Sequence, residues 1–362
     1  MTGPSDEYWF QPWKSYLAQQ GVHIETNSAL TRICVEHDGK KIAQCIVRHT
    51  DPAGGASHET IKADHYVLAV DPFTVHHLVK DSPELSKDPE LVKFSGLVQE
   101  GEHHNISFRI GFKESVRFPG KDTVVSIPDS PWNITLYAQE HHWDSDVDLG
   151  GDGEIKGLWS GTICVCNRPG KETGGRDALH VSREEFTKEI LHQITSCREF
   201  NEMVQVANEG RDLSSFEICE TEVWKEWRFE RDGDGYKAHT ADRKWVTTLK
   251  NSDFRPRPGT TSLTNLHLAG AHTKTSMHIW SQEGAAESGK AAARAVQLGD
   301  KGITDIPLYH HGPPSWVRAV QQVDNVLYRN GLPNVVDVVG GLAALAGLGA
   351  FAGLGAYALR TE

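Results

Sequence analysis

The residues best suited to chemistry lie in one strand-to-helix passage, residues 266–296. The apolar run "LTNLHLAGA" predicts a strand that ends in the small residues 269–271. The Ala-rich run Ser281–Val296 predicts a helix that begins near residues 279–282. A helix N-terminus presents backbone N–H groups that lack intrahelical partners, together with the positive end of the helix dipole.

Glycines make the start of this helix unusual. Gly284 and Ala285 leave its surface without side chains, so an anionic or electron-accepting ring edge could lie against it. Each mid-helix glycine, Gly284 and Gly289, costs about 1 kcal/mol relative to Ala, which favours a close approach of some group to the backbone. Tight packing of the helix on a sheet explains the same small residues equally well.

Histidine and cysteine are the other candidates for chemistry, and neither predicts a metal site. Of the 19 histidines, adjacent pairs begin at His76, His103, His141 and His310, and neighbours on a strand point to opposite faces. Cys164 and Cys166 are expected on one face of a strand, where core packing is the better interpretation. No H-E-x-x-H, Ser-His-Asp or Cys-His arrangement is assigned, and no catalytic base can be named from the sequence.

Composition limits the class of protein. The 362 residues suit about two domains. The formal charge of −12, without a Lys/Arg-rich run, argues against nucleic acid as a partner. Six cysteines are too few for a disulfide scaffold and favour a reducing compartment, cytoplasmic or stromal. The N-terminus shows no secretory signal peptide.

The first 70 residues predict the elements that position this passage. Aromatic and apolar residues at spacings of 3 to 4 predict a helix over Thr2–Gln20 with one buried face. Strands over Val22–Glu36 and Lys41–Thr50, joined at Asp38-Gly39, predict a hairpin, and residues 51–57 a loop. The run His65–Val70 is typical of a buried strand in a parallel sheet.

The middle of the chain predicts an antiparallel sheet with helices. Ser182, with Glu185 three residues later, forms a capping box that predicts a helix over Ser182–Ser196. Strands are expected over Asn105–Phe112, Thr123–Ile127, Asn133–Ala138 and Gly157–Val165.

Four passages together resemble the FAD-dependent amine oxidase superfamily. "NLHLAGAHTKTSMHIWSQEGAAESGKAAARAV" resembles its C-terminal flavin-binding segment, most closely that of the phytoene desaturase and hydroxysqualene-dehydroxylase-like branch. "GPSDEYWFQPWKSYLAQQGVHI" and "ADHYVLAVDP" resemble further parts of the FAD domain. "DSPWNITLYAQEHHW" and "GLWSGTICVCNRPG" resemble strands of the substrate domain. The resemblance covers Thr2 to Val296 in the family's order.

The resemblance implies FAD as cofactor and assigns residues to it. The implied contacts are Leu30 with the adenine, Gly270 and Ala271 with the ribityl-pyrophosphate, and Glu283, Gly284 and Ala285 with the isoalloxazine edge. Ala271 stands where the family has an acidic residue, which weakens that contact. Lys274, His278 and Trp280 are candidates for the flavin face and substrate access, although a surface lysine and a packing tryptophan are equally ordinary interpretations.

The family's opening strand–G-x-G-x-x-G–helix unit, which holds the pyrophosphate, does not occur in the sequence. The nearest glycine cluster, Gly150–Gly153, lies in a polar loop. The resemblance therefore implies the C-terminal portion of a flavoenzyme that binds FAD weakly or not at all by itself, with an N-terminal half polypeptide as a possible partner.

The C-terminal region predicts attachment to a membrane. Residues Val338–Leu359 form 22 residues without a charge and include a G-x-x-x-G pair at Gly349 and Gly353. A soluble Gly/Ala-rich helix is the alternative. Residues 315–328 predict an amphipathic helix at the membrane surface.

Together these patterns predict an α/β fold: an incomplete FAD-binding Rossmann-like domain, an α+β substrate domain with an antiparallel sheet, and a C-terminal hydrophobic helix. The expected boundaries are 1–72 and 251–300 for the FAD domain, 73–250 for the substrate domain, 301–333 for an amphipathic linker and 334–362 for the anchor. The expected function is hydride transfer from an isoprenoid or carotenoid-type lipid to flavin. The alternative is a non-catalytic, membrane-tethered binding or interaction protein that retains the substrate domain.

Overall fold

The computed structural model describes residues 3–99, 102–119, 124–138, 141, 143–144, 147–241, 243–277, 280–308 and 313–341. Contacts divide the chain into two compact units, residues 1–305 and 306–362. The first unit contains two separate hydrophobic cores. We call the parts built around them the parallel-sheet region and the antiparallel-sheet region.

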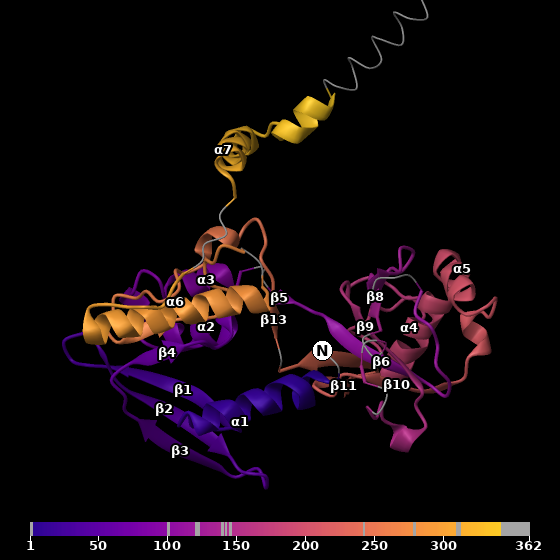
Figure 1. Ribbon diagram of the computed structural model, residues 1–362, viewed down its shortest axis with the longest axis horizontal. Helices are drawn as coiled ribbons and strands as arrows, with labels where there is room; N and C mark the ends of the chain where they lie inside the picture. Colours follow the sequence, from indigo (N-terminus) through magenta and orange to yellow (C-terminus); the bar gives the residue numbers. More distant parts are fainter. Residues whose placement is uncertain are drawn as a thin grey trace, which may run out of the picture. The chain divides into compact units, whose positions relative to one another are not determined.

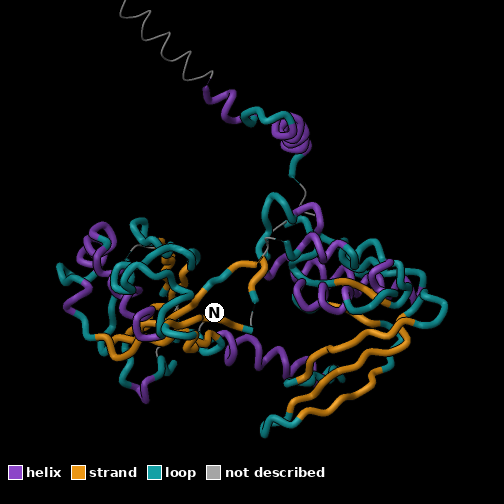
Figure 2. Tube along the Cα trace, turned by 180° about the vertical axis from the view of Figure 1, so that it is seen from behind, coloured by secondary structure: helices purple, strands orange, loops and turns teal. Residues whose placement is uncertain are grey.

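The parallel-sheet region contains a short parallel sheet, an antiparallel hairpin sheet and helices. The predicted hairpin is confirmed: β1 (Ser28–Val35) pairs antiparallel with β2 (Ile42–Thr50), and Gly39 adopts a positive φ of 73° in the turn. The predicted loop over residues 51–57 is too long, because its last residues already belong to β3 (Ala56–Ile61), which extends the sheet beside β2. In Figures 1 and 2 the helices of this region gather on one side of this three-stranded sheet. They are α2 (Pro72–Lys80), α3 (Lys93–Leu97) and α6 (Gln282–Lys301).

The predicted buried parallel strand is also confirmed. β4 (Tyr66–Leu68) pairs in parallel with β14 (Leu266–Leu268), although these segments lie 200 residues apart in the chain. The outer edge of β14 is covered by the protein's own loop, because Gly259 N–H donates to Leu268 O and Thr261 Oγ1 donates to Leu266 O. No described strand pairs with the outer edge of β4, where Val67 is 51% exposed.

The antiparallel-sheet region is built on one five-stranded sheet in the order β10-β6-β9-β8-β7. Its four earlier strands match the sequence prediction, whereas β10 and the hairpin β11–β12 were not predicted. Helix α4 begins with the predicted capping box: Glu185 N–H donates to Ser182 Oγ, and Ser182 N–H donates to the Glu185 carboxylate. The strands are β6 (Ile106–Phe112), β7 (Val124–Ser126), β8 (Ile134–Tyr137), β9 (Gly157–Ile163), β10 (Ile218–Val223), β11 (Trp227–Asp232) and β12 (Gly235–Thr240), and the helices are α4 (Arg183–Ser196) and α5 (Arg198–Ala207).

One short ladder links distant parts of this unit. β5 (Glu102–His103) pairs antiparallel with β13 (Lys244–Trp245). Trp245 itself belongs to the core of the parallel-sheet region, where its indole N–H donates to Leu97 O at 2.9 Å.

The N-terminal helix corrects a prediction. A π-helical turn, Asp6–Phe10, continues into α1 (Gln11–Gln19), so the helix itself is confirmed. Its apolar face is not buried: none of these residues is buried, and Trp13 is 51% exposed. The periodicity identified the helix, but it could not show whether the described chain provides a surface to cover that face.

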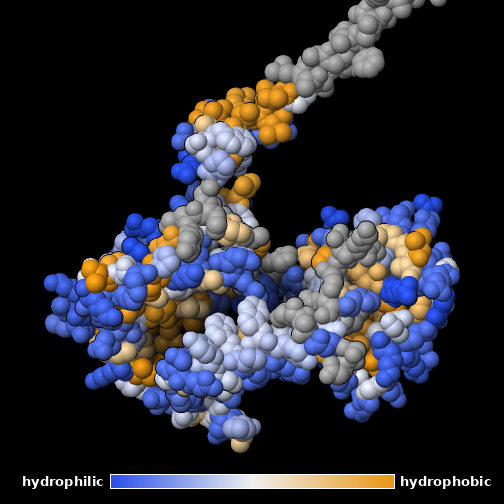
Figure 3. All heavy atoms as spheres, viewed as in Figure 1, coloured by the Kyte–Doolittle hydropathy of each residue, from blue (hydrophilic) through white to orange (hydrophobic). Residues whose placement is uncertain are grey.

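The second unit contains α7 (Ser315–Arg329), which confirms the helix expected there, and none of its residues is buried. Residues 335–341 are helical as well, and Figure 3 shows hydrophobic residues gathered on them. Of the predicted anchor, residues 342–362 lie outside the described residues. No helix within the described residues is long and apolar enough to cross a membrane.

Candidate functional site

The candidate site is the loop that joins β14 to α6, and Ser288 connects its two ends. Gly270 follows the strand with a φ of 119° and donates its N–H to Ser288 Oγ at 2.8 Å. Ser288 Oγ donates in turn to Ala285 O at 2.7 Å. The structure thus brings two of the predicted residues, Gly270 and Ala285, together through one buried hydroxyl on α6.

A buried arginine holds the same loop from the other side. Arg255, only 1% exposed, donates through Nη2 to Ala271 O at 2.7 Å and to Thr273 O at 2.5 Å, and through Nε to His272 O at 3.2 Å. On α6, Glu287 accepts from the N–H and the hydroxyl of Ser276. The conformation of the loop is therefore fixed at both ends.

Several polar atoms in and beside this loop lack partners. Among the described residues, four buried side-chain atoms make no hydrogen bond: Thr247 Oγ1, Arg255 Nη1, His272 Nε2 and Thr275 Oγ1. A buried polar group without a partner costs about 1–3 kcal/mol, so such atoms are usually paired. Three of the four belong to the loop or to the arginine that holds it, which makes this the place in the described chain where a polar ligand group is most needed.

His272 is neutral at physiological pH. Burial, together with the nearby Arg255 guanidinium, lowers the pKa of its imidazole to about 4, although Asp71 opposes the shift. Its ring lies against Gly270, so closely that a Cβ at that position would come within 2.4 Å of the ring, and it meets Phe94 edge-on at 5.5 Å. Arg255, whose pKa burial also lowers, is a guanidinium and remains the positive charge of the site.

The start of α6 differs from the prediction. The sequence predicted bare, unpaired amides, but Gly284 N–H donates to Ser281 Oγ at 3.2 Å. Gly284 is buried and belongs, with Ser288 and Ala292, to the stripe that faces the sheet. The burial of Gly284 is what the packing interpretation expects, whereas a Cβ at the exposed Gly289 would meet no atom within 4 Å. The helix also runs to Lys301, beyond the predicted end.

The remaining predicted residues are dispersed. Lys274 is exposed, and its backbone N–H donates to Pro256 O. Trp280 is exposed with its ring 6.3 Å from that of Trp245, and His278 lies outside the described residues. Leu30 lines a different cavity, of about 630 Å³, between β1 and α2.

The positions of Cys164 and Cys166 can be compared with the prediction that they pack in the core and bind no metal. Cys164 and Cys166 follow β9, which ends at Ile163, instead of lying within it. Cys166 is buried in the core, as expected for packing, and burial raises the pKa of its thiol to about 12.

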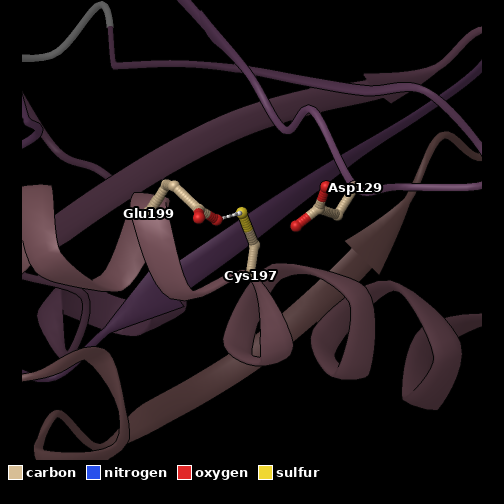
Figure 4. Close-up of side chains that lie close together, drawn as sticks. All are labelled: Asp129, Cys197 and Glu199. Atoms are coloured by element: carbon tan, nitrogen blue, oxygen red, sulfur yellow. Dashed lines mark hydrogen bonds between the residues drawn. The ribbon is translucent and has the colours of Figure 1, made fainter.

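One group within the described residues is close enough to share a metal ion. Asp129, Cys197 and Glu199 place one ligand atom each within 4.8 Å of the others (Figure 4). Cys197 is a core residue, and both acids are exposed, an arrangement common without a metal. We assign no metal to it.

The comparison with protein families decides what kind of loop this is. Residues 11–297 match the family described as flavin containing amine oxidoreductase, and the matched range includes β4, β14, the loop and most of α6. The chain belongs to this family. Membership implies a flavin cofactor and an oxidoreductase activity. A comparison with curated proteins finds no match.

Sequence reasoning missed Arg255, His272, Thr275, Glu287 and Ser288. Only Ser288 had a readable signal, because it stands four residues after Gly284 and four before Ala292 on the small-residue stripe of the helix. A buried arginine bound to backbone carbonyls leaves no periodic pattern in a sequence.

Proposed function

We propose that the chain is the flavin- and substrate-binding portion of an FAD-dependent oxidoreductase, with the loop 270–276 as the place where the flavin is held. The observation that carries this proposal is the gathering of unpaired buried polar atoms at that loop, within the range that matches the family. The donor set suits a flavin's heteroatoms: Arg255 Nη1 donates, and His272 Nε2 and Thr275 Oγ1 donate or accept.

FAD, when bound, accepts a hydride equivalent from a C–H bond of the substrate. Arg255 holds three carbonyls of the loop in place and keeps its Nη1 amino group for the cofactor. Its fixed positive charge stabilises negative charge that develops beside it, without reorganisation. Neutral His272 supplies a hydrogen bond and adds no second charge.

The pyrophosphate of FAD needs a unit that this sequence does not contain. The open outer edge of β4 is where an added strand would extend the parallel sheet, because the corresponding edge of β14 is already covered. We therefore retain the proposal of a polypeptide carrying a strand–G-x-G-x-x-G–helix unit as a partner. A strand added there would pair with the backbone of the exposed Val67.

Binding of FAD tests this proposal. FAD is titrated into the detergent-purified chain, alone and with a polypeptide carrying the strand–G-x-G-x-x-G–helix unit, and followed by its absorbance at about 370 and 450 nm. We expect binding that strengthens with the added polypeptide and weakens about 10-fold or more in Arg255→Met. Arg48→Met, an exposed arginine on β2, is the control and should bind as the wild type does. Failure of FAD to bind under both conditions contradicts the proposal.

The isoprenoid substrate and the non-catalytic alternative stay predictions. An isoprenoid substrate rests on the resemblance alone. The non-catalytic alternative is favoured by one observation, the capped amide of Gly284 at the start of α6, and the FAD titration separates it from the enzyme.

Membrane attachment rests on the exposed apolar side chains of α7 and of residues 335–341, and on the apolar sequence beyond them. A truncation after Gly331 should move the protein from the membrane pellet to the supernatant. Unchanged sedimentation with membranes contradicts an anchor in residues 334–362.

A further inference from the structure

A second cavity lies on the open face of the five-stranded sheet. Its volume is about 560 Å³, and strands β6, β8, β9 and β10 contribute to its wall. On the opposite face of the sheet, the alternate residues of β6 belong to the hydrophobic core: Ile106, Phe108, Ile110 and Phe112. The open face therefore presents the intervening residues of each strand.

The strand register places four polar residues in one row across this face. Glu222 on β10 is opposite Arg109 on β6, Arg109 is opposite Ser160 on β9, and Ser160 is opposite Tyr137 on β8. Neighbouring strands lie about 4.8 Å apart, so a small molecule over Arg109 also reaches the hydroxyls of Ser160 and Tyr137.

The adjacent row consists of hydroxyl residues alone. Ser107, Thr162, Thr135 and Ser126 follow one another across β6, β9, β8 and β7. The last two lie 3.2 Å apart at their hydroxyl oxygens. Together the two rows place several hydrogen-bonding side chains on one face of the sheet, where they can bind the polar group of a ligand.

The charges around the cavity are unequal. Among the described residues that line it, Arg109, Lys225 and Lys244 are basic and Glu222 is the one acid. The Arg109 guanidinium makes no hydrogen bond or ion pair of 4 Å or less with any residue that the structure describes, Glu222 included. This leaves its planar donor group available to a carboxylate, which it binds through two parallel hydrogen bonds.

Two tryptophans supply an apolar wall beside these charges. Trp227 is buried, and its indole N–H donates to Asn105 O at 3.2 Å, which fixes the ring. Trp224 is 47% exposed at the rim. An aromatic ring of a ligand gains contact area and stacking from such a wall.

We propose that this cavity binds a small aromatic carboxylate, with the carboxylate on Arg109 and the hydroxyls of Ser160 and Tyr137, and the ring against Trp224 and Trp227. As the substrate class of the oxidoreductase, this inference rests on the proposed function. As a binding site it stands without flavin, because none of the loop residues 270–276 lines the cavity.

Calorimetric titration of the full chain without added flavin tests the site. The probes are phenylacetate, 2-phenylethylamine and farnesol, which offer an anion, a cation with the same ring, and an isoprenoid. We expect phenylacetate to bind tightest, with affinity that falls as salt rises. Arg109→Met should weaken its binding about 10-fold or more, Arg109→Lys should weaken it less, and the distant Arg48→Met should leave it unchanged.

Three outcomes overturn the site: tighter binding of 2-phenylethylamine or farnesol, no measurable binding of phenylacetate, or wild-type affinity in Arg109→Met. Unchanged thermal unfolding of Arg109→Met shows that any lost affinity is not lost folding. Phenylacetate binding without FAD binding supports this cavity and refutes the oxidoreductase, and FAD binding without phenylacetate binding does the reverse.

Discussion

The two sheet regions of the first unit differ in how completely their buried polar groups are hydrogen-bonded. The antiparallel-sheet region buries its aromatic core under α4 and α5, and none of the four unpaired buried atoms among the described residues belongs to it. The parallel-sheet region contains all four of those atoms, three of them in the loop 270–276 or in the arginine that holds it. Buried polar groups without partners in the parallel-sheet region indicate that it binds something more in its native state. We propose that this is the flavin, together with a strand added to the edge of β4.

The largest expected effect concerns Arg255. Arg255→Met removes the donors to three carbonyls of the loop, all of which belong to buried residues, and should lower the free energy of unfolding by about 3 kcal/mol or more. Urea unfolding measures this. The exposed Arg48→Met should change it by about 0.5 kcal/mol or less. Equal stability of the two variants would show that the loop does not depend on its arginine.

The pH dependence of stability is the next largest effect. The pKa of His272 is about 4 in the folded chain and near the ordinary value of 6.5 when unfolded, so the unfolded state binds more protons between these values. Stability should therefore be full above pH 6.5 and fall as the pH is lowered toward 4, by about 3 kcal/mol in total.

His272→Phe isolates this contribution, because other histidines titrate in the same range. The burial of His267 and His76 also lowers the pKa of each. Unfolding free energies of the two proteins at several pH values from 4 to 7 should diverge, with the steeper slope in the wild type. Parallel curves would mean that His272 is not buried as a neutral ring.

The smallest expected effect concerns the antiparallel-sheet region. Ser182→Ala removes the side-chain cap of α4 and should cost about 1 kcal/mol, seen as a lower unfolding midpoint. Thr187→Ala, on the exposed side of the same helix, is its control. The loss should be the same with and without FAD, since none of the residues proposed to hold FAD belongs to this region; a loss that FAD abolishes would break the contrast between the regions.

Local sequence patterns predicted the helices, strands and turns well, but they did not predict which residues are buried or exposed. Asp38-Gly39 specified a hairpin turn, Ser182 with Glu185 specified a helix start, and the run around Tyr66 specified a parallel strand, because each signal lies within a few residues. The exposure of Trp13 and the burial of Arg255 depend on groups distant in the chain. The start of α6 was misjudged for a local reason: Ser281 was available as a cap, and its hydroxyl occupies an amide that the prediction left free.

The cavity on the sheet illustrates the same limit. The sequence predicted strands β6, β8 and β9 but not β10, so it could not place Glu222 beside Arg109. Register across strands is set by long-range pairing, and it alone aligned the polar row. The sequence alone therefore favours a lipid substrate without the polar row that the strand register creates.

Hydrogen exchange of the full chain together with the polypeptide carrying the strand–G-x-G-x-x-G–helix unit, with and without excess FAD and read by mass spectrometry, tests the central claim most directly. The account predicts that FAD slows exchange in the segments 266–277 and 280–290, where the loop and the start of α6 lie, and leaves β6 and β9 unchanged. Exchange in both segments that FAD does not alter would contradict it.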